Sequence, residues 1–213
     1  MRALKFLAHG AIGPYSKFRW PRPTSKDAGA WVIAASSISL CAHGIHACHV
    51  DDLSYLSSWL ADELWIIELA GEIRKEQRKI VAERGRLVQQ IEAWNRAVFA
   101  EFAQSAIFRA RDRIIKLVRG STNDEIAQML VETQDVSDIG KALAGRGTGT
   151  EAAELALGYL SDAVNFWEKE PAVAAFCAAH TTLSEDGFWA ERAYQSTWIA
   201  QRLDLARVMN SSP

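Results

Sequence analysis

The sequence has 213 residues, of which 49% are hydrophobic and 23% are charged, and this composition is typical of a globular chain that buries a core. It excludes the collagen-like and intrinsically disordered classes. The net charge is -2, and because a protein dedicated to nucleic acid usually carries a basic excess, nucleic acid is not an expected partner.

The sequence also indicates where in the cell the protein is expected. No apolar run approaches the roughly 20 residues that a membrane helix needs, and the first residues contain no apolar signal core. The three cysteines are an odd number, which argues against a disulfide framework. We therefore expect a cytoplasmic protein of bacterial type that has no membrane partner.

Short apolar runs separated by Gly, Pro and Ser predict strands in the first part of the chain. We expect strands over 3–8, 30–34, 64–69 and 79–82, with Gly71 ending the third of them. Asp51 or Asp52 is expected to cap a short helix that ends near Leu60. Strands mixed with one helix indicate an α+β domain over residues 1–85.

From Arg86 onward the apolar residues recur at spacings of three and four, which predicts helices. One long helix is expected to start near Arg86, and later ones to cover 150–170 and 184–208, with Pro171 in the first turn of the helix between them. A cap-rich segment at 121–125 starts another helix, and 145–149 forms a joint. The sequence thus predicts an all-helical domain over 86–213 that forms an antiparallel bundle. A homo-oligomer that assembles through this bundle is one arrangement that we consider.

Five side chains that are able to bind a metal fall within nine positions: Cys41, His43, His46, Cys48 and His49. Thiolate and neutral imidazole are good zinc ligands, and two of the histidines with Asp51 or Asp52 would suit iron. Adjacent residues of a strand point to opposite faces, however, so a regular strand cannot direct all five at one ion. The favoured interpretation is a buried strand with free cysteines. A single zinc or iron ion is the alternative, and thiol chemistry is a third.

His9 and Gly10 follow the first strand, and the segment Gly44-Ile45-His46 precedes the strand at 64–69. This order resembles the core of the ADP-ribosyltransferase group. The resemblance implies NAD as cofactor, with His9 orienting the nicotinamide ribose and Gly10 presenting backbone groups to the amide.

The resemblance also implies further site residues. Gly44 and Ile45 match the second motif of that group, and His46 stands where the group usually has Tyr. The catalytic candidates are His9 and His46, together with Glu68 or Glu83 as the carboxylate. We add Trp20 to the cofactor-binding candidates, because its Pro-rich loop can close over a ligand.

The segment 41–48 also resembles uncharacterised bacterial and phage proteins that share a Cys-x2-Gly-x-His-Ala-Cys motif followed by an aromatic-rich acidic strand. No activity follows from that resemblance. Three hypotheses therefore stand: a small-ligand protein that is an NAD-using transferase, a non-enzymatic interaction module that binds a protein partner in a phage or defence setting, and a metal-binding enzyme that uses the Cys/His cluster.

Overall fold

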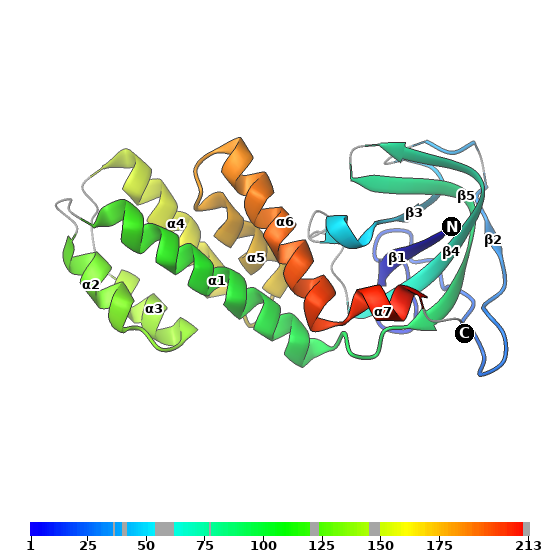
Figure 1. Ribbon diagram of the computed structural model, residues 1–213, viewed down its shortest axis with the longest axis horizontal. Coiled ribbons are helices and arrows are strands. Elements are labelled where there is room, and N and C mark those ends of the chain that lie inside the picture. The colour runs from blue at the N-terminus through cyan, green and yellow to red at the C-terminus, as the bar shows by residue number, and fades with distance from the viewer. Residues whose placement is uncertain are drawn as a thin grey trace. The chain divides into compact units, whose positions relative to one another are not determined.

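The protein is described by a computed structural model that covers residues 1–35, 37–39, 42–53, 62–76, 78–119, 124–144 and 150–210. It has an α+β fold, as the sequence predicts, with an antiparallel sheet in the N-terminal half and helices mostly in the C-terminal half (Figure 1). The chain forms two compact units. One consists of Met1–Arg96 together with Ser196–Pro213, and the other of Ala97–Gln195.

The sheet of the first unit contains five strands: β1 (Arg2–Leu7), β2 (Val32–Ile33), β3 (Ile45–Ala47), β4 (Glu63–Glu76) and β5 (Lys79–Gln90). β4 and β5 form a long hairpin, to which β1 adds on the side of β4 and both β2 and β3 add on the side of β5. The strands predicted at 3–8, 30–34, 64–69 and 79–82 therefore all exist, although β2 is shorter and the last two are longer than expected.

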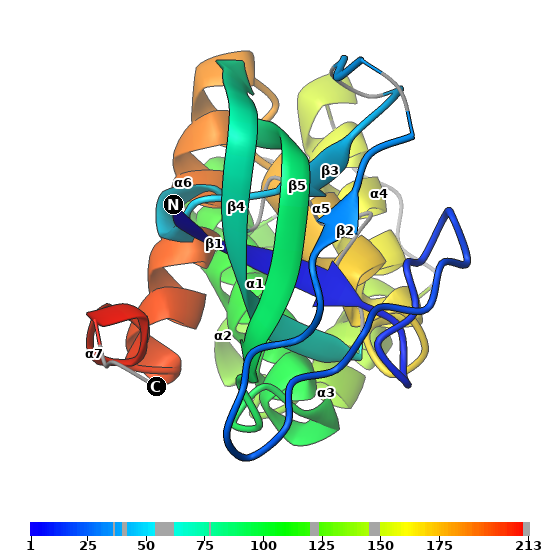
Figure 2. The same cartoon turned by 90° about the vertical axis from the view of Figure 1, so that its right-hand side faces the viewer.

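The sheet also closes on itself. Leu4 of β1 and Cys48, which directly follows β3, exchange two backbone hydrogen bonds of 2.9 Å. β1, β4, β5 and β3 thereby surround a small interior, and β1 crosses the hairpin obliquely (Figure 2). Side chains alternate along each strand, so every second one points inward. The inward set forms one core: Ala3, Leu7, Ile45, Ala47, Trp65, Ile67, Leu69, Ile80, Ala82 and Leu87 pack there with Ala11 and Trp20.

The prediction that Gly71 ends a strand is wrong. β4 continues through Gly71 to Glu76, with an irregular register between Ala70 and Ile73. Gly71 has a φ of +76°, and a Cβ there would collide with the carboxylate of Glu83, which accepts the N–H of Glu72 at 3.1 Å. The glycine thus permits a bulge inside the strand and does not terminate it.

The prediction that a helix starts near Arg86 is also wrong. β5 runs to Gln90, and the first helix starts ten residues later than expected, at Arg96. Leu87 points into the sheet core opposite Ile67, and the N–H of Ile91 donates to the carbonyl of Leu64 at 2.8 Å. The apolar residues that follow Arg86 therefore belong first to the end of a strand and then to a helix, and their spacing alone does not reveal the boundary between the two.

The helices are α1 (Arg96–Val118), α2 (Asp124–Glu132), α3 (Val136–Leu143), α4 (Glu151–Phe166), α5 (Pro171–His180), α6 (Glu185–Arg202) and α7 (Leu205–Asn210). Thr150 caps α4, and Pro171 occupies the first turn of α5 as predicted. The helix expected over 184–208 is instead two helices, α6 and α7. The chain turns between them at Asp204, whose φ is +49°. Of the predicted helix between Asp51 and Leu60, residues 54–60 lie outside the described part of the chain.

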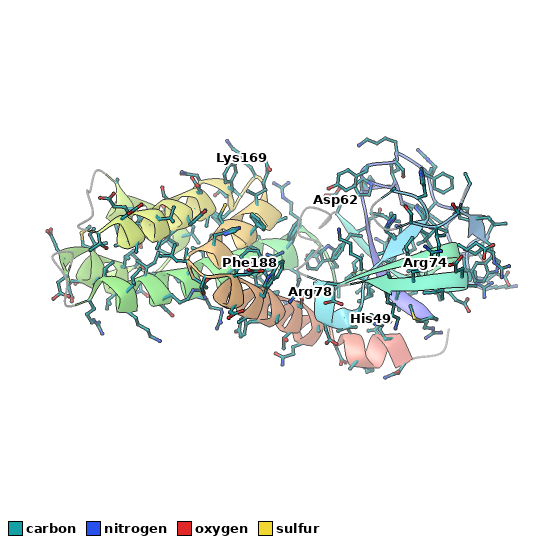
Figure 3. All side chains as sticks on the ribbon, turned by 90° about the horizontal axis from the view of Figure 1, so that it is seen from above. His49, Asp62, Arg74, Arg78, Lys169 and Phe188 are labelled. Carbon is teal, nitrogen blue, oxygen red and sulfur yellow. The ribbon has the colours of Figure 1, made fainter. Side chains whose placement is uncertain are left out.

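The helical unit contains one buried acidic side chain that organises several polar groups. Glu191 accepts hydrogen bonds from Arg109 at 3.1 Å and from Arg113 at 2.5 Å, and Arg113 also donates to the carbonyl of Ala178. Phe188 projects from α6 (Figure 3) and packs against His180 in a tilted arrangement, with ring centroids 4.5 Å apart. Arg109, Arg113, His180 and Phe188 thus have structural roles within the helical unit. Among the described helices, none combines the length and apolar character needed to cross a membrane.

Candidate functional site

A pocket of about 740 Å³ lies in the N-terminal unit. Its walls come from four segments within the first 46 residues, and the lining residues are 5 and 6, then 13–16 with 18 and 20, then 32–35, and 42–46. β1, β2 and β3 supply rigid walls, and the loop before Trp20 supplies an aromatic one. A concave site assembled in this way from a rigid scaffold and a loop is the usual form of a small-molecule site.

Lys5 is the polar centre of this pocket. It pairs with Trp65 across β1 and β4, and it stands between Ala3 and Leu7 on the inward face of the strand. Its Nζ donates a hydrogen bond of 2.7 Å to the carbonyl of His46 and lies 5.1 Å from the centroid of the Trp20 ring. Burial lowers the pKa of Lys5 to about 8, and the nearby Cys48 opposes this shift. Lys5 was not among the site residues that the sequence predicts.

The predicted cofactor residues Gly44 and Ile45 line the pocket, and so does His46, which was predicted as a catalytic residue. Gly44 has a φ of +118°, and a Cβ there would collide with Val81, so the turn into β3 requires glycine. Burial lowers the pKa of His46, and the positive charge of Lys5 lowers it further. The His46 ring is therefore a neutral group at pH 7 beside a cation.

Trp20, also predicted to bind a cofactor, is buried at the pocket and packs edge-to-face against Phe18, with ring centroids 5.7 Å apart. Phe18 and Tyr15 line the same wall and remain exposed, Tyr15 to 64%. The loop thus presents one fixed indole and two accessible rings, which are suitable partners for a planar ligand.

His9 and Gly10 lie outside the lining of this pocket. The side chain of His9 is 92% exposed, and its Nδ1 is 3.6 Å from Glu63. The N–H of Gly10 donates to Oε1 of Glu63 at 2.8 Å, so it is already engaged by the protein itself. Gly10 has a φ of +88° and the following Ala11 has a φ of +58°, a backbone conformation that the carboxylate stabilises.

Glu63 is a second residue that the sequence analysis missed. Its buried carboxylate accepts the N–H groups of Gly10 and Ala11 and the indole N–H of Trp65. It thereby fastens the start of the loop that leads to Trp20 onto the start of β4. A signal was present in the sequence: an acidic residue at the start of an otherwise apolar strand, where a buried carboxylate needs several donors.

The two predicted catalytic carboxylates do not line the pocket. Glu68 forms a charge-assisted pair with Arg86, whose Nε donates at 2.7 Å. Arg86 in turn lies over the Trp31 ring, 4.7 Å from its centroid. Glu83 fills the space beside Gly71 in the bulge of β4. Both carboxylates thus have structural partners.

The Cys/His cluster is divided between environments. Cys48 is buried, and burial raises the pKa of its thiol to about 12, so without a metal ion it is a neutral thiol at neutral pH. His43 is exposed at the pocket. Burial raises the pKa of the Asp52 carboxyl, and Arg78 and His49, both labelled in Figure 3, lower it by less.

Cys41 lies outside the described residues. Within the part of the chain that the structure describes, no three His, Cys, Asp or Glu side chains are grouped so that they would hold a metal ion. The metal site with zinc or iron, which includes Cys41, stays a prediction.

Residues 1–98 match a family described as Domain of unknown function (DUF7666). The match covers the whole sheet and the start of α1, and it is consistent with the resemblance of the N-terminal region to an uncharacterised family. No curated protein and no solved structure matches the chain.

Proposed function

We propose that the N-terminal unit binds a small molecule that combines a planar ring with an anionic group. The observation that carries the proposal is the position of Lys5 in the pocket. Among the described lining residues it is the only Lys, Arg, Asp or Glu, and aromatic side chains surround it.

An anion is favoured on electrostatic grounds. The cation of Lys5 is desolvated, and the protein offers its Nζ a carbonyl and the face of an indole ring. No carboxylate belongs to the described lining of the pocket. A buried charge without an opposite charge is unfavourable, so a ligand carboxylate or phosphate beside Lys5 would stabilise it.

A planar ring is favoured by the loop wall. Tyr15 and Phe18 are exposed at the pocket and Trp20 is buried behind them, so a flat ligand can cover apolar surface without burying polar groups. Nicotinamide nucleotides belong to this ligand class, and Gly44, Ile45, His46 and Trp20 already line the pocket. Because Glu68 and Glu83 do not line it, the proposal is limited to binding and includes no transfer step.

Isothermal calorimetry of the full chain with NAD, nicotinamide mononucleotide, AMP and the uncharged nicotinamide tests the proposal. We expect at least one anionic compound to bind with a Kd below about 1 mM and nicotinamide to bind more weakly. The variant Lys5→Met should weaken binding by about 10- to 100-fold, which corresponds to one charge-assisted hydrogen bond. The matched control is Lys26→Met, which removes an exposed lysine that does not line the pocket.

Equal affinity of Lys5→Met and Lys26→Met for an anionic compound would show that Lys5 does not hold the ligand. If no compound binds to the folded protein at millimolar concentration, the small-ligand proposal fails. The interaction-module hypothesis would then be the stronger one.

A further inference from the structure

We propose that Lys5 is a nucleophilic lysine that captures its ligand covalently, by forming an imine with an aldehyde or ketone group of the bound molecule. The inference rests on the proposed function, because it places the ligand in the same pocket. It adds a chemical class to that ligand: a planar, anionic carbonyl compound.

The geometry fixes the amine where a ligand can reach it. Lys5 is in the middle of a strand that pairs with β4 along its whole length, so its backbone position is rigid. Nζ is held between the His46 carbonyl at 2.7 Å and the face of the Trp20 ring, and Lys5 belongs to the lining of the cavity. A reactive group that is held at one point of a pocket gains the advantage of proximity over a lysine that moves freely in solvent.

The electrostatics of the site favour the neutral amine, which is the nucleophilic form. Burial lowers the pKa of Lys5 to about 8, against the small opposing effect of the Cys48 thiol. At pH 8 about half of the Lys5 side chains are therefore neutral, compared with about one in 250 for an ordinary lysine with a pKa near 10.4. This difference raises the concentration of the reactive form by about a hundredfold. Two titratable groups interact electrostatically with Lys5: Cys48, and His46, whose pKa is lowered by burial and by the charge of Lys5.

The reaction balances without an oxidant or a further reactant. The lone pair of neutral Nζ attacks the carbonyl carbon, the carbon–oxygen π electrons move to oxygen, and a proton passes from nitrogen to that oxygen to give a carbinolamine. Elimination of one water molecule then forms the carbon–nitrogen double bond.

The product also suits the pocket. A protonated imine keeps one N–H, which can continue to donate to the His46 carbonyl where the ammonium group donates now. Its positive charge remains over the Trp20 ring and beside the ligand anion. The contacts that hold the free amine therefore hold the imine as well.

The test uses pyridoxal 5′-phosphate, a probe that is planar, anionic and an aldehyde, and pyridoxine 5′-phosphate, which carries an alcohol in place of the aldehyde. The full-length protein is incubated with each compound, reduced with sodium borohydride and digested, and the modified lysines are identified by mass spectrometry. We expect about one equivalent of label on Lys5 with the aldehyde and none with the alcohol. Labelling of Lys5 should rise with pH around a midpoint near 8.

The variant Lys5→Arg, which keeps the charge but cannot form the imine, should lose this label, and Lys26→Arg should retain it. The comparison of label on Lys5 with label on Lys26 in the wild-type protein already decides whether the imine forms at Lys5, so the test does not depend on the folding of a variant. If both phosphates bind by calorimetry but Lys5 is not labelled in excess of Lys26, the imine is refuted and the binding proposal survives. If neither compound binds and Lys5 is not labelled, both proposals fail for this ligand class.

Discussion

The substitution Glu63→Gln tests whether one buried carboxylate holds the pocket loop in place. Oε1 of Glu63 accepts from the N–H of Gly10 at 2.8 Å and from Arg22 at 3.4 Å. Oε2 accepts from the N–H of Ala11 at 3.0 Å and from the indole of Trp65 at 2.9 Å. Glutamine has one acceptor oxygen and one NH2 group, so the donors at one of the two oxygen positions would face the NH2 group and lose their acceptor. The remaining pair would lose the negative charge.

The magnitude follows from these four contacts. A hydrogen bond to a charged group contributes about 1.5–3 kcal/mol, and a buried donor without an acceptor costs about 1–3 kcal/mol. We therefore expect Glu63→Gln to lower the free energy of unfolding of the N-terminal unit by about 3 kcal/mol. With an m-value of about 2 kcal/mol/M, the urea midpoint would fall by about 1.5 M. The loop that carries Tyr15, Phe18 and Trp20 should loosen, and ligand affinity should fall with it.

The matched control is Glu68→Gln, the same substitution on the same strand. Glu68 is 37% exposed and pairs with Arg86, so its loss should cost no more than about 1 kcal/mol. Urea unfolding gives the free energies, and hydrogen exchange of peptides that contain Gly10 and Ala11 shows whether the effect is local. If the two variants differ by less than about 1 kcal/mol and exchange at residues 10 and 11 is unchanged, the reasoning about Glu63 is refuted.

Three further predictions concern protonation and backbone conformation. Burial lowers the pKa of Lys5 to about 8 in the folded protein, so the unfolded chain binds more protons between pH 8 and about 10.4. The free energy of unfolding of the wild type should therefore rise over that range relative to that of Lys5→Met. Urea unfolding at several pH values measures both free energies, and a difference between them that does not change with pH would contradict this prediction. Burial raises the pKa of Cys48 to about 12 and also raises that of the half-buried Cys177, so iodoacetamide at pH 8 should alkylate Cys177 faster than Cys48. Peptide mapping that finds these two cysteines labelled equally fast would refute the burial argument. Gly44→Ala should destabilise the protein by about 2 kcal/mol, because residue 44 has a positive φ. Gly158→Ala in α4, where a Cβ meets nothing within 4 Å, should stabilise the protein by about 0.5–1 kcal/mol. Midpoints of thermal unfolding that shift in the same direction for both variants would contradict this prediction.

Local patterns in the sequence were enough for several elements. The dense apolar run at 64–69 predicted the core of β4, and Pro171 marked the first turn of α5, because strand propensity and the missing N–H of proline act within a few residues. The assignment of Gly44, Ile45 and His46 to a site came from a family resemblance; these residues line the pocket, and their role in binding stays a prediction. Local reasoning failed at Gly71, where a bulge inside β4 looked like a strand end, and at Arg86, where the last part of β5 looked like the start of a helix.

The centre of the pocket was decided only by tertiary structure. Lys5 looks like an ordinary polar position of a strand until closure of the sheet, through the bonds between Leu4 and Cys48, turns its face inward. Glu63 acquires its role only because the N–H groups of Gly10 and Ala11, more than 50 residues earlier, meet its carboxylate. Burial and hydrogen-bond partners depend on which distant segments pack together. The pKa of Lys5 and the anchoring of the loop are therefore properties of the folded chain, and no local pattern in the sequence encodes them.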